Sequence, residues 1–173
     1  MDPISQITNS LSPYFGATAQ VSGSLVGLVF VALTFNIKAL GLRGNPALRA
    51  FARQTLGDFL LVLVLSLSML IPQMPRDNLG LVLAILGAVG MFEALRSLWI
   101  VRRAEGASAP RGLLVQRLGL SILGNLGVLS ASVLLLIQSQ NLSAIGSLLV
   151  SVPVILIISG CRSAWLLVLH AAD

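Results

Sequence analysis

Four long stretches of this sequence contain no charged residue, and they limit the possible folds more than any other feature. They cover residues 3–37, 59–75, 78–92 and 118–161. A helix that crosses a bilayer needs about 20 mostly apolar residues, so these stretches hold several such helices. Only 10% of the chain is charged, against about 25% in soluble domains. The sequence therefore predicts an all-α integral membrane protein.

Five transmembrane helices are the economical count, because the last charge-free stretch is too long for one span and is divided at Gln138-Ser139-Gln140-Asn141. We expect a single transmembrane domain over residues 1–173. Its expected parts are an outer interfacial segment (1–16), a first span with a basic cytoplasmic loop (17–55), a first helical hairpin (56–100), a basic linker (101–117) and a second hairpin (118–173).

Two signals concern where helices begin. Asn45-Pro46 is a cap followed by a first-turn proline, so the second span should begin as a helix outside the membrane. No basic residue precedes the first apolar run, so we expect the first helix to stay in the mature chain.

The basic residues are distributed unevenly among the connections. If the N-terminus is outside, ten of the eleven Lys and Arg residues fall on the inner side and only Arg76 falls outside. Positive residues in short loops mark the cytoplasmic side. We therefore expect a multi-pass protein of a bacterial inner (plasma) membrane, with the N-terminus outside and the C-terminus in the cytoplasm.

The two predicted hairpins share matched features in the same order, which indicates an internal repeat. The matched segments are Leu56-Gly57-Asp58 with Leu123-Gly124-Asn125, Asn78-Leu79 with Asn141-Leu142, and Arg96-Ser97-Leu98-Trp99 with Arg162-Ser163-Ala164-Trp165. Each unit goes from inside to outside and back. The hairpins should then be parallel copies related by an axis along the membrane normal, with the first span as an extra N-terminal helix.

Charged and polar residues at membrane depth are the candidates for a functional site. Asp58 and Arg96 are both expected near the inner end of the first hairpin, where we predict a structural ion pair. Glu93 precedes Arg96 by three residues, so the two can neutralise each other; if Asp58 takes Arg96, Glu93 becomes the better cation or proton site. Asn125 is expected to hydrogen-bond Arg162, which keeps a spare charge for an anion or an anionic lipid head group at the cytoplasmic face.

Small residues recur every four positions on two spans, which lets another helix approach closely. The two sets are Ala19, Gly23 and Gly27 in the first span, and Gly80, Ala84 and Ala88 in the third. Packing within one chain explains such ridges, and contact between subunits of a homo-oligomer is the alternative.

Several functional classes are disfavoured by what the sequence lacks. Cys161 and His170 are the only residues of their types, so we expect no internal disulfide, no metal site and no cofactor. No base is placed beside a nucleophile, and Asp58 is the only aspartate placed for intramembrane proteolysis, which needs two acids; we expect no enzyme. The basic residues carry no interleaved aromatic side chains, so nucleic acid is not an expected partner.

Residues 27–36 read Gly-Leu-Val-Phe-Val-Ala-Leu-Thr-Phe-Asn and are followed by a basic loop. The run resembles the first helix of uncharacterised small bacterial multi-pass membrane proteins, which carry a Phe-Val-Ala-Leu-Ser/Thr-x-Asn pattern and end in a tryptophan-containing helix such as 164–168. The resemblance implies a bacterial inner membrane and carries over no functional residue.

Two functions remain open from the sequence. In the first, the chain is a subunit of a small oligomeric channel or transporter, for cations, with Glu93, Asn125 and Asp58 lining the path. Rings of acidic side chains select cations, and a homo-oligomer would form such a ring from Glu93. In the second, the chain is a non-catalytic regulatory protein that docks onto another membrane protein. The lipid bilayer is a partner in both.

Overall fold

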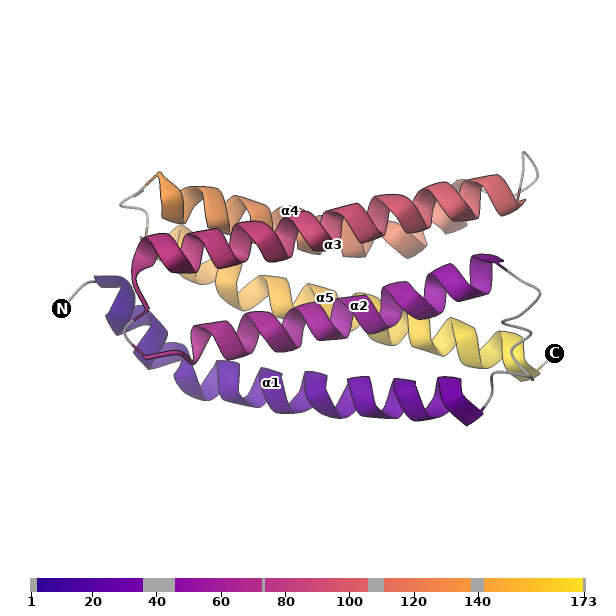
Figure 1. Cartoon of the computed structure of the whole chain (residues 1–173), viewed down its shortest axis with the longest axis horizontal. Coiled ribbons are helices and arrows are strands. Elements are labelled where there is room, and N and C mark those ends of the chain that lie inside the picture. Colours follow the sequence, from indigo (N-terminus) through magenta and orange to yellow (C-terminus); the bar gives the residue numbers. More distant parts are fainter. Residues whose placement is uncertain (1–2, 36–45, 73, 106–110, 138–141, 173) are drawn as a thin grey trace.

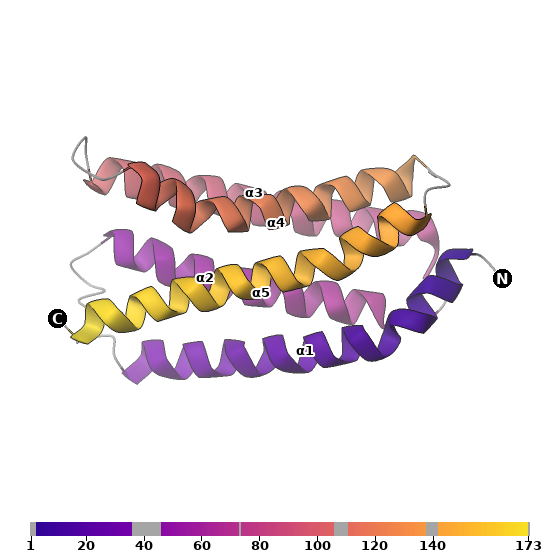
Figure 2. The ribbon, with the colours of Figure 1, turned by 180° about the vertical axis from the view of Figure 1, so that it is seen from behind.

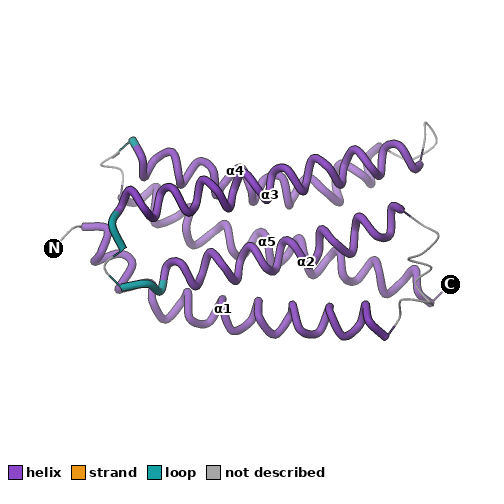
Figure 3. The backbone as a smooth tube through the Cα atoms, in the orientation of Figure 1, coloured by secondary structure: helices purple, strands orange, loops and turns teal. Residues whose placement is uncertain are grey.

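A computed structural model describes residues 3–35, 46–72, 74–105, 111–137 and 142–172 of the chain. These residues form five α-helices: α1 (Pro3–Phe35), α2 (Pro46–Met69), α3 (Arg76–Glu105), α4 (Arg111–Leu136) and α5 (Leu142–Ala172). The described residues contain no strand (Figure 3). Each helix is long and apolar enough to cross a membrane, which confirms the prediction of an all-α, multi-pass membrane protein.

The helices lie side by side along the long axis of the molecule (Figure 1). Helix α2 packs against α3, α3 against α4, α4 against α5, and α5 against α2, so these four helices form a closed bundle. Helix α1 packs mainly along α2 and touches α5 less extensively. Figure 2 shows the same arrangement from behind, with α1 at the edge of the molecule. The interior of the protein is therefore enclosed by α2 to α5.

Helix α1 is continuous from Pro3 to Phe35, so the segment expected at the interface and the first span belong to one helix from Pro3 onward. Its early part packs into the protein: Phe15 is fully buried, and the Tyr14 hydroxyl donates a hydrogen bond to the Val150 carbonyl oxygen at 2.7 Å. Tyr14 thus attaches α1 to α5 about one turn before Pro153, a proline within α5.

The predicted starts of α2 and α5 agree with the structure. Helix α2 begins at Pro46, as the cap-and-proline signal indicates, and α5 begins at Leu142. Helix α4 begins at Arg111, inside the expected linker 101–117. At the turn between α2 and α3, the Arg76 guanidinium donates from Nε to the Leu135 carbonyl oxygen at 3.1 Å, so it caps the C-terminal end of α4.

Glycine lets α3 approach α4 closely at Gly80, which belongs to the predicted ridge, and at Gly87, which does not. Gly80 packs against Leu136, and a side chain at Gly87 would meet the side chain and backbone nitrogen of Leu129. Ala88 is exposed instead. On α1, Ala19 is buried and Gly23 faces Leu63, while Gly27 is exposed with open space around it. Each predicted ridge is therefore only partly used within the chain.

We expect Gly87→Ala to lower the thermal unfolding temperature of the detergent-solubilised protein. The added methyl group would lie 3.2 Å from the Leu129 backbone nitrogen, and overpacking of this kind costs about 1–3 kcal/mol. Gly119→Ala is the matched control, because nothing lies within 4 Å of its added atom. Equal unfolding temperatures for the two variants would contradict the close contact between α3 and α4.

Candidate functional site

Asp58 is the buried carboxylate of the helical bundle. It lies on α2, six residues after Ala52, where the apolar part of that helix begins; at 1.5 Å per residue this is about 9 Å along the helix. Its side chain is only 2% exposed. A charge at membrane depth is costly unless it is paired, hydrogen-bonded or wet, so the partners of this carboxylate decide what it can do.

The two carboxylate oxygens of Asp58 accept hydrogen bonds from three helices. Oδ1 accepts from Gln54 Nε2 at 3.0 Å and from the Ser121 hydroxyl at 2.7 Å. Oδ2 accepts from the Ser159 hydroxyl at 3.2 Å. The two oxygens are therefore unequal: Oδ1 has two short bonds, and Oδ2 has one longer bond.

Further hydrogen bonds connect these residues into a network that we name the polar cluster: Gln54, Asp58, Ser97, Ser121 and Ser159. Gln54 Nε2 also donates to Ser121 Oγ at 2.7 Å, and Gln54 Oε1 accepts from the Ser97 hydroxyl at 3.0 Å. All five residues are buried, and they come from α2, α3, α4 and α5. Each hydrogen bond of the network is donated either to Asp58 directly or to a side chain that itself donates to Asp58.

The local sequence explains how the cluster is assembled. Gln54 and Asp58 are four residues apart and so share one face of α2. Gly160 allows α5 to approach α2 closely, since a side chain there would meet the ring of Phe59. Phe59 is itself fully buried and adjacent to Asp58. This contact between Gly160 and Phe59 places Ser159 within hydrogen-bonding distance of the carboxylate.

Asn125 lies one helical turn after Ser121 and is completely buried. Its Nδ2 donates to the Ser121 carbonyl oxygen at 2.9 Å, but its Oδ1 has no hydrogen-bond partner. Oδ1 packs directly against Gly90 of α3, where any side chain would collide with it. Asn125 therefore borders the cluster and carries an unsatisfied buried acceptor, a costly feature in a protein interior.

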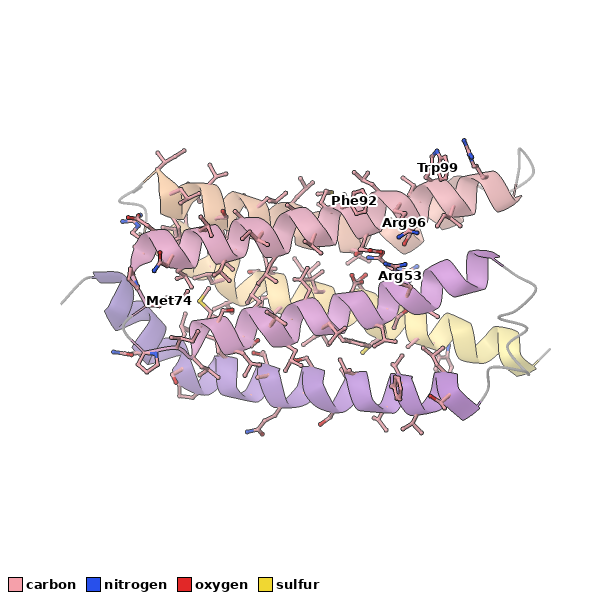
Figure 4. All side chains as sticks on the ribbon, in the orientation of Figure 1. Arg53, Met74, Phe92, Arg96 and Trp99 are labelled. Carbon is pink, nitrogen blue, oxygen red and sulfur yellow. The ribbon has the colours of Figure 1, made fainter. Side chains whose placement is uncertain are left out.

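The predicted ion pair between Asp58 and Arg96 is not formed, and this expectation was wrong. Asp58 has no basic partner among the described side chains, and Arg96 is exposed. Neighbouring residues point about 100° apart around a helix, and it is Ser97 that faces the interior. Figure 4 shows Arg96 on the side of α3 toward α2, with Trp99 on the opposite side.

Glu93 is paired, but with a residue that the sequence did not indicate. Its carboxylate accepts from Arg53 Nη2 at 2.8 Å, and the two side chains are 27% and 60% exposed respectively. The pair joins α3 to α2 on the outside of the bundle, while Gln54, the next residue along α2, points inward. Of the three predicted path residues, Asp58 and Asn125 thus lie inside the bundle and Glu93 lies at its surface.

Arg162 is exposed and makes no contact with Asn125, so the predicted hydrogen bond between them is also absent. Cys161, next to Arg162, is exposed as well. The Arg103 guanidinium lies 3.5 Å from the centre of the Trp99 ring, as a cation–π contact. These side chains surround the end of the bundle near the polar cluster but take no part in it.

The interior beyond the cluster, toward the start of α1, is mainly apolar. The buried apolar residues there include Leu61, Val62, Leu65, Leu83, Val128, Ala131, Leu135, Leu149 and Val152. The polar cluster lies near the other end, where α2 and α4 begin and α3 and α5 end. A small ion at Asp58 would therefore be close to one end of the bundle and separated from the other by packed side chains.

Sequence patterns pointed to Asp58 and Asn125 but missed Gln54, Ser97 and Ser159. The i to i+4 spacing of Gln54 and Asp58 was an available signal. No comparable signal distinguishes Ser159 from the exposed Ser151 on the same helix. Among the described residues, no three His, Cys, Asp or Glu side chains come together as metal ligands.

We expect Gln54→Ala and Asp58→Ala to be coupled in their effect on thermal unfolding, because each removes the hydrogen bond between Gln54 Nε2 and Asp58 Oδ1. Contacting residues give coupling energies of about 0.5–3 kcal/mol in double-mutant cycles. Arg96→Ala combined with Asp58→Ala is the matched control and should be additive. Additivity in the first cycle, or coupling in the second, would contradict the described geometry.

The chain matches no protein-family model, no curated protein and no solved structure. Its function has to be inferred from the arrangement of its own side chains.

Proposed function

We propose that this protein transports cations across the membrane and that the polar cluster is its ion-binding site. The observation that carries the proposal is the Asp58 carboxylate, 2% exposed and without a basic partner in the described part of the chain. A structural carboxylate in a membrane is normally paired with a cation. A carboxylate whose partners are neutral hydrogen-bond donors can bind a cation in one part of a transport cycle and release it in another.

The position of the cluster supports the same proposal. It lies at the contact of α2, α3, α4 and α5, and transporters built from repeats bind their substrates between the repeats. Packed apolar residues fill the bundle on one side of it. A transporter needs a site that is closed from at least one side at any time, and this arrangement meets that requirement.

The internal repeat belongs to this proposal. Helices α2 and α3 would form one unit and α4 and α5 the other, with α1 as the extra helix at the edge. Gln54 and Asp58 on α2 then correspond to Ser121 and Asn125 on α4, each pair being four residues apart. The repeat would bring one acidic and one amide residue together from equivalent positions.

Glu93 is a weaker candidate for the charged centre than Asp58, because Arg53 already neutralises it. A selectivity ring made by Glu93 of several subunits is therefore not needed for transport. We retain the homo-oligomer as a proposal. Gly27 and Ala88 are exposed members of the two predicted ridges and are available to a second copy.

The orientation proposed for the protein follows the basic residues: the N-terminus lies outside a bacterial inner membrane and the C-terminus inside. The polar cluster would then lie in the inner half of the bilayer. Arg162, exposed at the same end, suits an anionic lipid head group of the cytoplasmic leaflet.

We expect a cysteine introduced at Ser5, in a Cys161→Ser background, to react with a membrane-impermeant reagent in intact cells. The reason is the ten-to-one distribution of basic residues. A cysteine at Ser108 in the same background is the control, and it should react only after the cells are lysed. Protection at Ser5 together with labelling at Ser108 would reverse the topology.

We expect the full-length protein to support cation flux in liposomes and Asp58→Asn to lose most of it, because the substitution removes the charge and keeps the shape. Proton, sodium and potassium flux should be measured separately. Asp77→Asn is the matched control, since Asp77 is exposed at the start of α3, and it should keep the flux. Absence of all flux in the parent protein would favour the alternative, a regulatory protein that docks onto another membrane protein.

A further inference from the structure

The transport proposal leaves the cation unspecified, and the hydrogen bonds around Asp58 distinguish a metal ion from a proton. A metal ion requires several oxygen lone pairs directed at one point. At Asp58 the neighbouring groups present hydrogens instead. Gln54 Nε2 lies 3.0 Å from Asp58 Oδ1 and 2.7 Å from Ser121 Oγ and donates to both oxygens, so Gln54 turns an N–H group and not a lone pair toward Asp58.

The orientation of the Gln54 amide is fixed by its neighbours. Its oxygen accepts from the Ser97 hydroxyl at 3.0 Å, on the side away from Asp58. Reversing the amide would place its oxygen against a charged carboxylate oxygen, two acceptors in contact. Ser121 is also committed, because its oxygen accepts from Gln54 while its hydroxyl donates to Asp58. A metal ion that bound Asp58 Oδ1 would therefore have to displace hydrogen bonds from both residues.

Binding a proton requires, first, a free lone pair on the carboxylate and, second, a neighbouring acceptor for the new O–H group. Oδ2 of Asp58 provides the lone pair. Oδ1 already accepts two bonds, whereas Oδ2 accepts only the 3.2 Å bond from Ser159. Ser159 provides the second, because a serine hydroxyl both donates and accepts and can rotate between the two roles. We infer, on the basis of the transport proposal, that the ion bound at this site is a proton on Asp58 Oδ2.

A proton from water forms an O–H bond with Oδ2, and the charge of Asp58 changes from −1 to zero. The Ser159 hydroxyl, which donated to the carboxylate, turns and accepts from the new O–H group. The bonds from Gln54 and Ser121 to Oδ1 stay in place, so the helices keep their contacts. Release of the proton to water reverses each change.

The other charged or titratable side chains that the structure describes near the cluster lie outside the bundle. On α2 and α3 these are the Arg53–Glu93 pair, Arg96 and Arg103, and on α5 they are Cys161 and Arg162. The described side chains of α4 are all uncharged, and those of α1 include only Tyr14, which bonds to Val150. Asp58 is therefore the group at this site that a proton inside the bundle would reach.

Infrared spectroscopy of the full-length purified protein, recorded as the pH is varied, tests this inference directly. We expect the C=O band of a protonated carboxyl group to titrate with pH and to be lost in Asp58→Asn. Ser159→Ala should move the band to higher frequency, because the acceptor is gone. Ser159→Thr keeps the hydroxyl and should restore the parent frequency. Ser147→Ala, an exposed serine on the same helix, should leave the band unchanged.

A second measurement requires no variant. At constant pH, exchanging sodium or potassium for a large organic cation should change neither the band nor the unfolding temperature. A band that responds to sodium or potassium, or a carboxyl group that never protonates, would overturn the inference. Flux driven by a sodium gradient and insensitive to pH would leave transport standing and refute proton binding. A titrating Asp58 band without any flux would refute transport and uphold the proton site.

Discussion

The need of a buried carboxylate for hydrogen-bond donors determines much of this structure. Asp58 receives donors from α2, α4 and α5, and Ser97 of α3 orients one of those donors. All four helices of the closed bundle thus contribute to one group. Close contacts at Gly160 and Gly90 keep α5 near α2 and α3 near α4, the distances that this arrangement needs. Loss of the carboxylate would leave several buried donors without an acceptor. The desolvation penalty of such unsatisfied donors exceeds the net stabilisation that a typical hydrogen bond contributes.

The number of helices and the approximate position of each were predictable, because the thickness of a bilayer sets how long an apolar stretch must be. Burial of Asp58 was also foreseeable from its position after the start of an apolar run. The hydrogen-bond and ion-pair partners of the polar side chains were less predictable. A helix surrounded by lipid and by other helices is apolar on all sides, so hydrophobic periodicity does not show which face is turned inward.

Two pairs of neighbouring residues illustrate this limit. Arg53 and Gln54 are adjacent on α2, yet one is exposed and the other is part of the cluster. Arg96 and Ser97 are divided in the same way on α3. A rotation of about 100°, one residue step around a helix, would exchange their roles and produce the ion pair expected from charge alone. Packing of glycine against larger side chains selects the rotation, and that packing depends on all the helices together.

Arg76 is the one basic residue counted on the outer side, and its bond to Leu135 gives it a separate meaning. The C-terminal end of a helix carries a partial negative charge, which the guanidinium meets at the end of α4. The exception to the charge asymmetry is thus also a structural group of the fold, because the same guanidinium joins the start of α3 to the end of α4.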